Sequence, residues 1–263
     1  MYGFVPPCHC LSARPVQPQT PASTYSVYKM IPVYLGGTPG TNRVVVFSSN
    51  SGLSSRVQVQ QYDSASGQWL VEYQKEAEGI PFFSVLDGYW EAAGQNVVVL
   101  FYTTGSGGYL YYWVLGKKGG KIVEIVNRKE IFQGDVWLES GKLLEQYANR
   151  YRVWVRRNGR IMLIPYALPI IPGAKVLRYR ITPKGEVVIA SKNFSVPIGS
   201  VVQIIRTDLN PITERLLFGY TPTVKFLQHK SGFKFLDKGT LELTIIPQGY
   251  DWDKSVDIVV EAK

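Results

Sequence analysis

Cysteine and histidine are the residues that this sequence has least of. With 2 Cys and 2 His in 263 residues, it cannot build a scaffold stapled by several disulfides or a site made of several histidines. It also contains no Gly-x-Ser-x-Gly, His-Glu-x-x-His or phosphate-loop motif, the local patterns of common hydrolases, zinc peptidases and nucleotide-binding proteins. From these absences we predict that the protein is not an enzyme and holds no cofactor and no metal.

Uninterrupted hydrophobic runs are missing as well. The longest stretch without a charged residue, 92–116, is long enough for a membrane-spanning helix, but Thr103-Thr-Gly-Ser-Gly-Gly108 interrupts it. Two β-rich runs around a polar, glycine-rich turn predict a hairpin instead. The first residues also lack the basic and apolar parts of a secretory signal. We therefore expect no membrane span.

Tyrosine and positive charge are what the sequence has in plenty. It contains 17 Tyr, and aromatic residues make up 13% of the chain, a composition that favours strands and adhesive surfaces. The formal net charge is +9, from 29 basic and 20 acidic residues. Such a surface attracts anions, so an acidic polysaccharide or another polyanion is a candidate partner. The alternative is that the charge only keeps the surface solvated.

Short strand patterns separated by turns dominate the chain from residue 43 onward. Asn158-Gly159, between the strand patterns 151–156 and 161–164, is the strongest hairpin signal, because this dipeptide tolerates the left-handed conformations of a two-residue hairpin turn. Only 138–148 is a candidate for a short helix. The pattern as a whole predicts an all-β protein.

Three of these strands begin alike and recur at a nearly constant spacing. Val44-Val-Val-Phe47, Val97-Val-Val-Leu100 and Tyr151-Arg-Val-Trp154 lie 53 and 54 residues apart. Residues 43–165 thus resemble β-propeller blades of the FG-GAP or VCBS type, without the Asp-rich calcium loop of that family. The resemblance implies propeller-like sheets. Because three blades do not close a propeller, a plain β-sandwich is the competing prediction.

Proline marks the boundaries between parts of the chain. Seven of the 16 prolines fall in residues 1–40, which we interpret as an extended arm whose part near 25–35 can dock as a strand. A β-rich domain with the repeats follows at 41–165. The segment 165–173 holds three more prolines and is the best linker. Residues 174–263 are predicted to form an immunoglobulin-like β-sandwich.

Cys8-His9-Cys10 is the one compact group of metal-type ligands, and it lies in the arm. Zinc needs four ligands, and the sequence has no second pair. A disulfide between Cys8 and Cys10 would be strained, whereas thiols on an extended arm can cross-link neighbouring subunits. The arm resembles the N-terminal connector arms of endospore appendage subunits, which implies a homo-oligomer or polymer outside the cell, on a cell or spore surface. The alternative is a tail with incidental thiols.

The segment 150–160 contains five arginines. On a strand, Arg150, Arg152, Trp154 and Arg156 share one face. Guanidinium groups around an indole can stack on a base or a sugar and can pair with phosphate or carboxylate. We therefore consider this row a ligand-binding site. The alternative is a solvated strand face with the arginine stems packed over Trp154.

Together these features predict a non-enzymatic structural protein of a cell or spore surface that self-assembles through its arm or its sheet edges. A module that binds glycans or polyanions is the first alternative. A propeller-type enzyme acting on glycans is the less favoured one, since it needs two carboxylates in one cleft, which spacing along the sequence does not reveal. The candidate acids are Glu72, Asp87, Glu91, Asp135 and Glu139.

Overall fold

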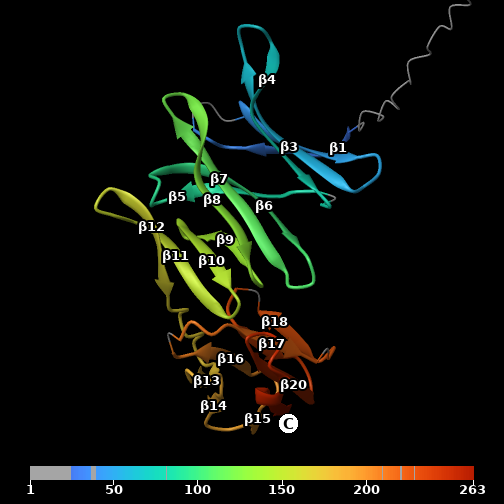
Figure 1. Cartoon of the computed structure of the whole chain (residues 1–263), viewed down its shortest axis with the longest axis vertical. Coiled ribbons are helices and arrows are strands. Elements are labelled where there is room, and N and C mark those ends of the chain that lie inside the picture. Colours follow the sequence, from blue (N-terminus) through green and yellow to red (C-terminus); the bar gives the residue numbers. More distant parts are fainter. Residues whose placement is uncertain (1–24, 37–39, 81, 209, 220, 228) are drawn as a thin grey trace, which may run out of the picture.

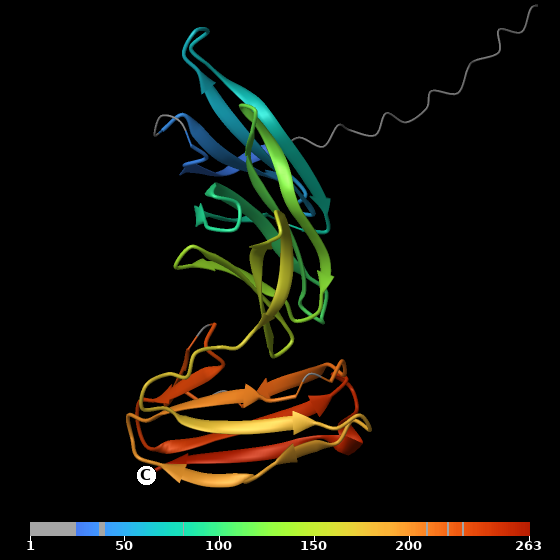
Figure 2. The ribbon, with the colours of Figure 1, turned by 90° about the vertical axis from the view of Figure 1, so that its left-hand side faces the viewer.

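The structure is a computed structural model that describes residues 25–36, 40–80, 82–208, 210–219, 221–227 and 229–263. Its regular elements are the strands β1 to β21 and one 3-10 turn, η1 (Trp252–Lys254), so the all-β prediction is confirmed. The first three sheets and then the C-terminal part follow one another along the long axis of the molecule in chain order (Figures 1 and 2). Among the described residues, no helix has the length and apolar character needed to cross a membrane.

The first three sheets are antiparallel, and each is made of four strands in chain order, so that every connection within a sheet is a hairpin. Asn158 and Gly159 both have positive φ, 49° and 74°, and connect two strands paired up to Arg157 and Arg160, as the hairpin prediction required. The strands of the first sheet are β1 (Tyr25–Val33), β2 (Asn42–Ser49), β3 (Ser54–Asp63) and β4 (Gln68–Glu78). Those of the second are β5 (Ser84–Trp90), β6 (Gln95–Thr104), β7 (Tyr109–Lys118) and β8 (Lys121–Ile131). Those of the third are β9 (Asp135–Glu139), β10 (Lys142–Tyr147), β11 (Arg150–Arg157) and β12 (Arg160–Tyr166).

These three sheets share hydrophobic cores with their neighbours in the stack. Val46 of the first sheet and Leu100 of the second belong to one buried cluster. Val99, on the other face of β6, belongs to a second cluster together with Leu143 of the third sheet. The continuous apolar run of β6 follows from this position, because a strand covered on both faces needs hydrophobic side chains on both.

The C-terminal part consists of two sheets that enclose one core, which includes Tyr179, Phe233, Leu243 and Ile258. Two of its strand pairings, β13 with β16 and β15 with β21, are parallel, whereas immunoglobulin sheets are antiparallel. The immunoglobulin-like detail therefore stays a prediction, as does the propeller detail of the first three sheets. One sheet has the order β14 (Val187–Ile189), β13 (Lys175–Ile181), β16 (Val201–Arg206), β19 (Gly232–Phe235), β18 (Val224–Leu227). The other has the order β15 (Asn193–Val196), β21 (Val256–Ala262), β20 (Gly239–Pro247), β17 (Glu214–Phe218).

The segment between the third sheet and the C-terminal part is held against the latter. The fully buried side chain of Gln203 donates to the carbonyl of Pro169 and accepts a hydrogen bond from the backbone N–H of Ile171, both at 3.1 Å. The proline-rich composition predicted a linker, and Gln203 fastens this segment at two backbone positions. A buried amide with both ends satisfied restrains the chain that it contacts.

Two details differ from the sequence-based expectations. The candidate helix at 138–148 is wrong, because Ser140 and Gly141, with φ of 49° and 76°, form a tight turn between β9 and β10. Val44 and Val97 lie on the second strands of their sheets, but Tyr151 lies on a third strand, β11, so the spacing of 54 residues does not relate equivalent strands. The part of the arm near 25–35, expected to be able to dock as a strand, does so: the first sheet begins at Tyr25, and β1 pairs with β2 along its length.

The outer face of the first sheet carries a hydrogen-bonded polar layer. Alternation along β2 and β3 turns Arg43, Gln58 and Gln60 away from the second sheet. Hydrogen bonds of 2.8 Å connect Arg43 to Gln60, Gln60 to Gln58, and Gln58 to Gln74 on β4. The Arg43 guanidinium lies 4.0 Å from the centre of the Trp69 ring. This hydrogen-bonded layer ends the stack in the way that a capping repeat ends a repeat protein.

Candidate functional site

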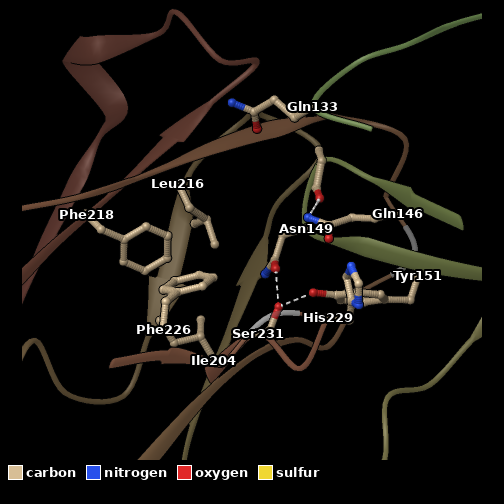
Figure 3. Close-up of a pocket in the computed structure, with 11 residues that line it drawn as sticks. Gln133, Gln146, Asn149, Tyr151, Ile204, Leu216, Phe218, Phe226, His229 and Ser231 are labelled. Carbon is tan, nitrogen blue, oxygen red and sulfur yellow. Dashed lines mark hydrogen bonds between the residues drawn. The ribbon is translucent and has the colours of Figure 1, made fainter. Parts of the chain in front are cut away.

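A cavity of about 280 Å³ lies where the third sheet meets the C-terminal part. One wall is apolar and comes from the C-terminal part, with Ile204, Leu216, Phe218 and Phe226. The side chains on the opposite side are polar, and several of them come from the end of β10 and from β11 (Figure 3). The cavity thus combines an aromatic surface with hydrogen-bonding groups, the usual composition of a small-molecule site.

A chain of hydrogen bonds runs from the cavity into the C-terminal part. Ser231 donates to the side-chain oxygen of Asn149 at 2.6 Å, so the hydroxyl of Tyr151, 2.6 Å from Ser231, donates to it. Asn149 donates to the hydroxyl of Tyr179, and Tyr179 donates to the carboxylate of Glu214, both at 2.8 Å. Every proton in this chain points toward Glu214. The chain fixes the third sheet against the C-terminal part through buried groups, which enforce one geometry.

The charged groups at the end of this chain of hydrogen bonds are the Glu214 carboxylate and the Arg206 guanidinium. Burial raises the pKa of Glu214, and the guanidinium of Arg206 opposes that shift. Burial also raises the pKa of Tyr151 to about 12 and that of Tyr179 well above its usual range. Both phenols therefore keep their protons at neutral pH, and they act as hydrogen-bond donors rather than as bases.

His229 lies beside this chain but is not part of it. Its ring is stacked on Trp137, with centroids 4.2 Å apart and an interplanar angle of 5°, and its Nε2 lies 2.8 Å from a carboxylate oxygen of Asp135. Asp, His and Ser are the residue types of a hydrolytic triad, but the hydroxyl of Ser231 bonds to Asn149 and Tyr151. Without an imidazole to accept its proton, that hydroxyl is not an activated nucleophile.

Left-handed backbone gathers around the cavity. Four lining residues other than glycine have positive φ: Gln133 (45°), Ala148 (52°), His229 (58°) and Ser231 (43°). Such conformations cost of order 1–3 kcal/mol each where the surrounding structure imposes them, and they cluster at functional sites. The same strain places two of the polar side chains, those of His229 and Ser231, against Tyr151 and Asp135.

The row of residues predicted to bind a ligand lies on β11, with its first two arginines engaged inside the chain. Arg150 donates to the carbonyl of Ile212 in the C-terminal part at 2.9 Å. Arg152 is ion-paired with the buried carboxylate of Glu145 and lies 4.9 Å from the centre of the Tyr147 ring. Both guanidinium groups thus have acceptors within the chain, and ligand binding by this part of the row stays a prediction.

The other half of the predicted row borders a second cavity, of about 420 Å³. Trp154 donates to the hydroxyl of Tyr112 at 2.8 Å, and Arg156 donates to the carbonyl of Ala92 at 2.7 Å. Arg156 itself is exposed, and Lys142 lines the same cavity. Cys8 and Cys10, the predicted cross-linking residues, lie outside the described residues.

Sequence reasoning missed the residues of the junction. Asp135 and His229 are separated by 94 positions and Asn149 and Ser231 by 82, so no spacing rule connects them. The rarity of histidine is the only signal in the sequence for His229, and Asp135 is one of five candidate acids there.

In the part of the chain that the structure describes, no group of three or more His, Cys, Asp or Glu side chains is arranged to hold a metal ion. Comparison of the chain with models of protein families, with curated proteins and with solved structures found no match.

Proposed function

We propose that this protein is a structural component that self-assembles through its N-terminal segment and the edge strand β1. The observation that carries the proposal is the exposure of this strand. β1 is the terminal strand of the first sheet, and five consecutive residues from Ser26 to Met30 are exposed. A free edge of this kind is a template for pairing with another chain.

The side chains of β1 support the same proposal. Val27, Tyr28 and Met30 are 54%, 56% and 57% exposed, and Tyr28 is stacked on the ring of Phe82 at 4.8 Å between centroids. The hydrogen-bonded polar layer covers the part of the outer face formed by β3 and β4. Val27 and Met30 pair with Phe47 and Val45, so they lie on that outer face, beside the polar layer. The apolar surface for contact between subunits therefore lies along the β1 margin of the face.

Residues 1–24 precede this edge directly. If extended, a segment of that length spans at most about 80 Å, enough to reach a neighbouring copy and to bring Cys8 and Cys10 to it. A disulfide between copies would then lock a contact that the β1 edge begins. The proposal includes the localisation of the protein on a cell or spore surface, because stable disulfides form in oxidising surroundings outside the cell.

Sedimentation velocity of the oxidised full chain is expected to reveal species larger than the monomer. Removing residues 1–20, or replacing both Cys8 and Cys10 with serine, should shift the distribution toward the monomer without abolishing association through β1. A reducing agent should act like the serine variant. Val27→Lys should weaken the association that remains without disulfides, because it places a charge on the apolar edge.

The matched control is Val188→Lys on β14, the edge strand of the C-terminal part, where the side chain is 39% exposed. It should leave the distribution of the full chain unchanged. A full chain that sediments as a monomer at every concentration, oxidised as well as reduced, would contradict the proposal.

Polyanion binding is a second candidate function, and one observation favours it. Arg156, Lys142 and Trp154 line the 420 Å³ cavity together with Tyr166, so two cations and two aromatic rings border one space. Glu91 lies there too and limits the positive potential. Aromatic and cationic side chains in one groove can hold a sugar acid or a phosphorylated polymer.

Retention on a heparin column tests this candidate. Arg156→Ala should elute at a lower salt concentration than the wild type, because one contact with the polyanion is lost. Arg157→Ala removes the same charge from the next residue of β11, whose side chain points to the other face, and serves as the control. Equal shifts for the two variants would mean that net charge alone governs retention, and this cavity would not be the site.

A further inference from the structure

We infer that the 280 Å³ cavity at the junction binds one neutral sugar ring, a function beyond self-assembly. Three features of the cavity carry this inference: an exposed aromatic wall, amide groups with unused hydrogen-bonding capacity, and a described lining whose imidazole is already paired with a carboxylate. Each feature narrows the chemical class of the ligand.

The aromatic wall is formed by Phe218 and Phe226, whose rings meet edge to face with centroids 5.0 Å apart. Phe226 is 53% exposed, and in Figure 3 both rings lie on the side of the cavity opposite Gln146. An exposed phenyl ring at the rim of a cavity offers a flat apolar surface to an occupant. The C–H face of a pyranose ring is a surface of matching shape and polarity.

The amide groups supply what the hydroxyl groups of a sugar need. Among the described residues, the side-chain amide of Gln133 has no hydrogen-bond partner, and Gln146 uses only its nitrogen, which donates to the carbonyl of Ala148 at 2.7 Å. An amide donates and accepts at once, and a sugar hydroxyl does the same. Gln133 and Gln146 can therefore bind adjacent hydroxyl groups without a change of protonation.

The charge of the lining favours a neutral ligand. None of the lining residues is a carboxylate, a lysine or an arginine, and His229 is held by Asp135. A charged ligand would enter this cavity without a counter-ion, and burying an unpaired charge is costly. The volume also limits the size, because pockets for drug-sized ligands measure about 300–1,000 Å³, and this one is suited to a single ring.

Backbone conformation and hydrogen bonds preorganise the lining of the cavity. Gln133 and His229 both have left-handed backbone, as do two further lining residues, and the chain from Tyr151 through Ser231 to Asn149 holds the polar side of the cavity in place. Side chains fixed before a ligand arrives lose little conformational freedom when it binds. We therefore place the ligand between the phenyl rings and the two glutamine amides.

Saturation-transfer NMR with the full chain tests the inference. The probes are four neutral sugars, glucose, galactose, mannose and N-acetylglucosamine, with glucuronate as the anionic comparison. At least one neutral sugar is expected to bind with a millimolar dissociation constant, and more tightly than glucuronate. Phe226→Ala and Gln133→Ala should each weaken that binding about tenfold, a change of about 1.4 kcal/mol.

Trp252→Ala is the matched control, because this ring is 58% exposed in the same part of the chain and does not line the cavity. It should bind the sugar as the wild type does. Phe226 is itself exposed, so its replacement leaves the fold intact, which circular dichroism would verify. Absence of binding by all four neutral sugars, tighter binding of glucuronate, or unchanged affinity in both cavity variants would overturn the inference.

Discussion

Replacing Glu145 with alanine is expected to lower the free energy of unfolding by about 3–5 kcal/mol. The side chain of Glu145 is fully buried, and it is ion-paired with Arg128 at 3.2 Å and with Arg152. It also accepts a hydrogen bond of 2.7 Å from the hydroxyl of Tyr112. Without the carboxylate, two guanidinium groups and a phenol lose their common partner between the second and third sheets. Urea unfolding followed by tryptophan fluorescence measures the change.

Two further variants separate the charge of Glu145 from its hydrogen bonds. Glu145→Gln keeps an acceptor for Tyr112 but removes the charge, and an intermediate loss is expected. Glu139→Ala, at an exposed position on β9 of the same sheet, should change the free energy of unfolding by no more than about 0.5 kcal/mol. A loss below about 1 kcal/mol in Glu145→Ala would mean that the ion pairs of this sheet contribute little.

Arg206→Ala is expected to cost a similar amount, about 3–5 kcal/mol, but in a pH-dependent way. The side chain of Arg206 is 2% exposed and bridges Glu214 and Asp208. It also donates to the carbonyl of Ile212 at 2.7 Å. Its removal leaves the buried carboxylate of Glu214 without its cation, next to the chain of hydrogen bonds that fixes the junction.

The direction of the pH dependence follows from the pKa of Glu214. Burial already raises this pKa above its usual value of 4.5, and the loss of Arg206 raises it further. A carboxyl with a raised pKa in the folded state is least destabilising below its unfolded pKa, and its cost grows as pH rises through the folded pKa. The stability difference between wild type and Arg206→Ala should therefore be smaller at pH 4 than at pH 7.

Arg206→Ala combined with Glu214→Gln is the control for this mechanism. The glutamine carries no charge, so the double variant should lose most of the pH dependence that the single variant shows near neutral pH. A stability difference between wild type and Arg206→Ala that stays constant from pH 4 to pH 7 would show that the uncompensated charge of Glu214 is not the cause.

Local signals in the sequence were sufficient for the fold class. Asn158-Gly159 specified a hairpin because both residues adopt positive φ, and the glycine-rich turn at 105–108 converted a long uncharged stretch into β6 and β7. Alternation placed Arg152 and Trp154 on the same face of β11. Trp154 donates to the hydroxyl of Tyr112 in the second sheet, and Arg152 is ion-paired with Glu145, the carboxylate to which that hydroxyl donates. Strands and turns depend on neighbours in the chain, which a single sequence contains.

Packing between distant segments of the chain decided which partners the side chains of each strand face contact. The sequence placed Arg152 in a ligand-binding row, whereas packing pairs it with the buried Glu145 of the neighbouring strand β10. The junction cavity needs Asn149 and Ser231 side by side, and they are 82 positions apart, so only the docking of the C-terminal part on the third sheet brings them together. A periodic pattern predicts which side chains share a face, but the partner of that face is set by the free energy of packing the whole chain.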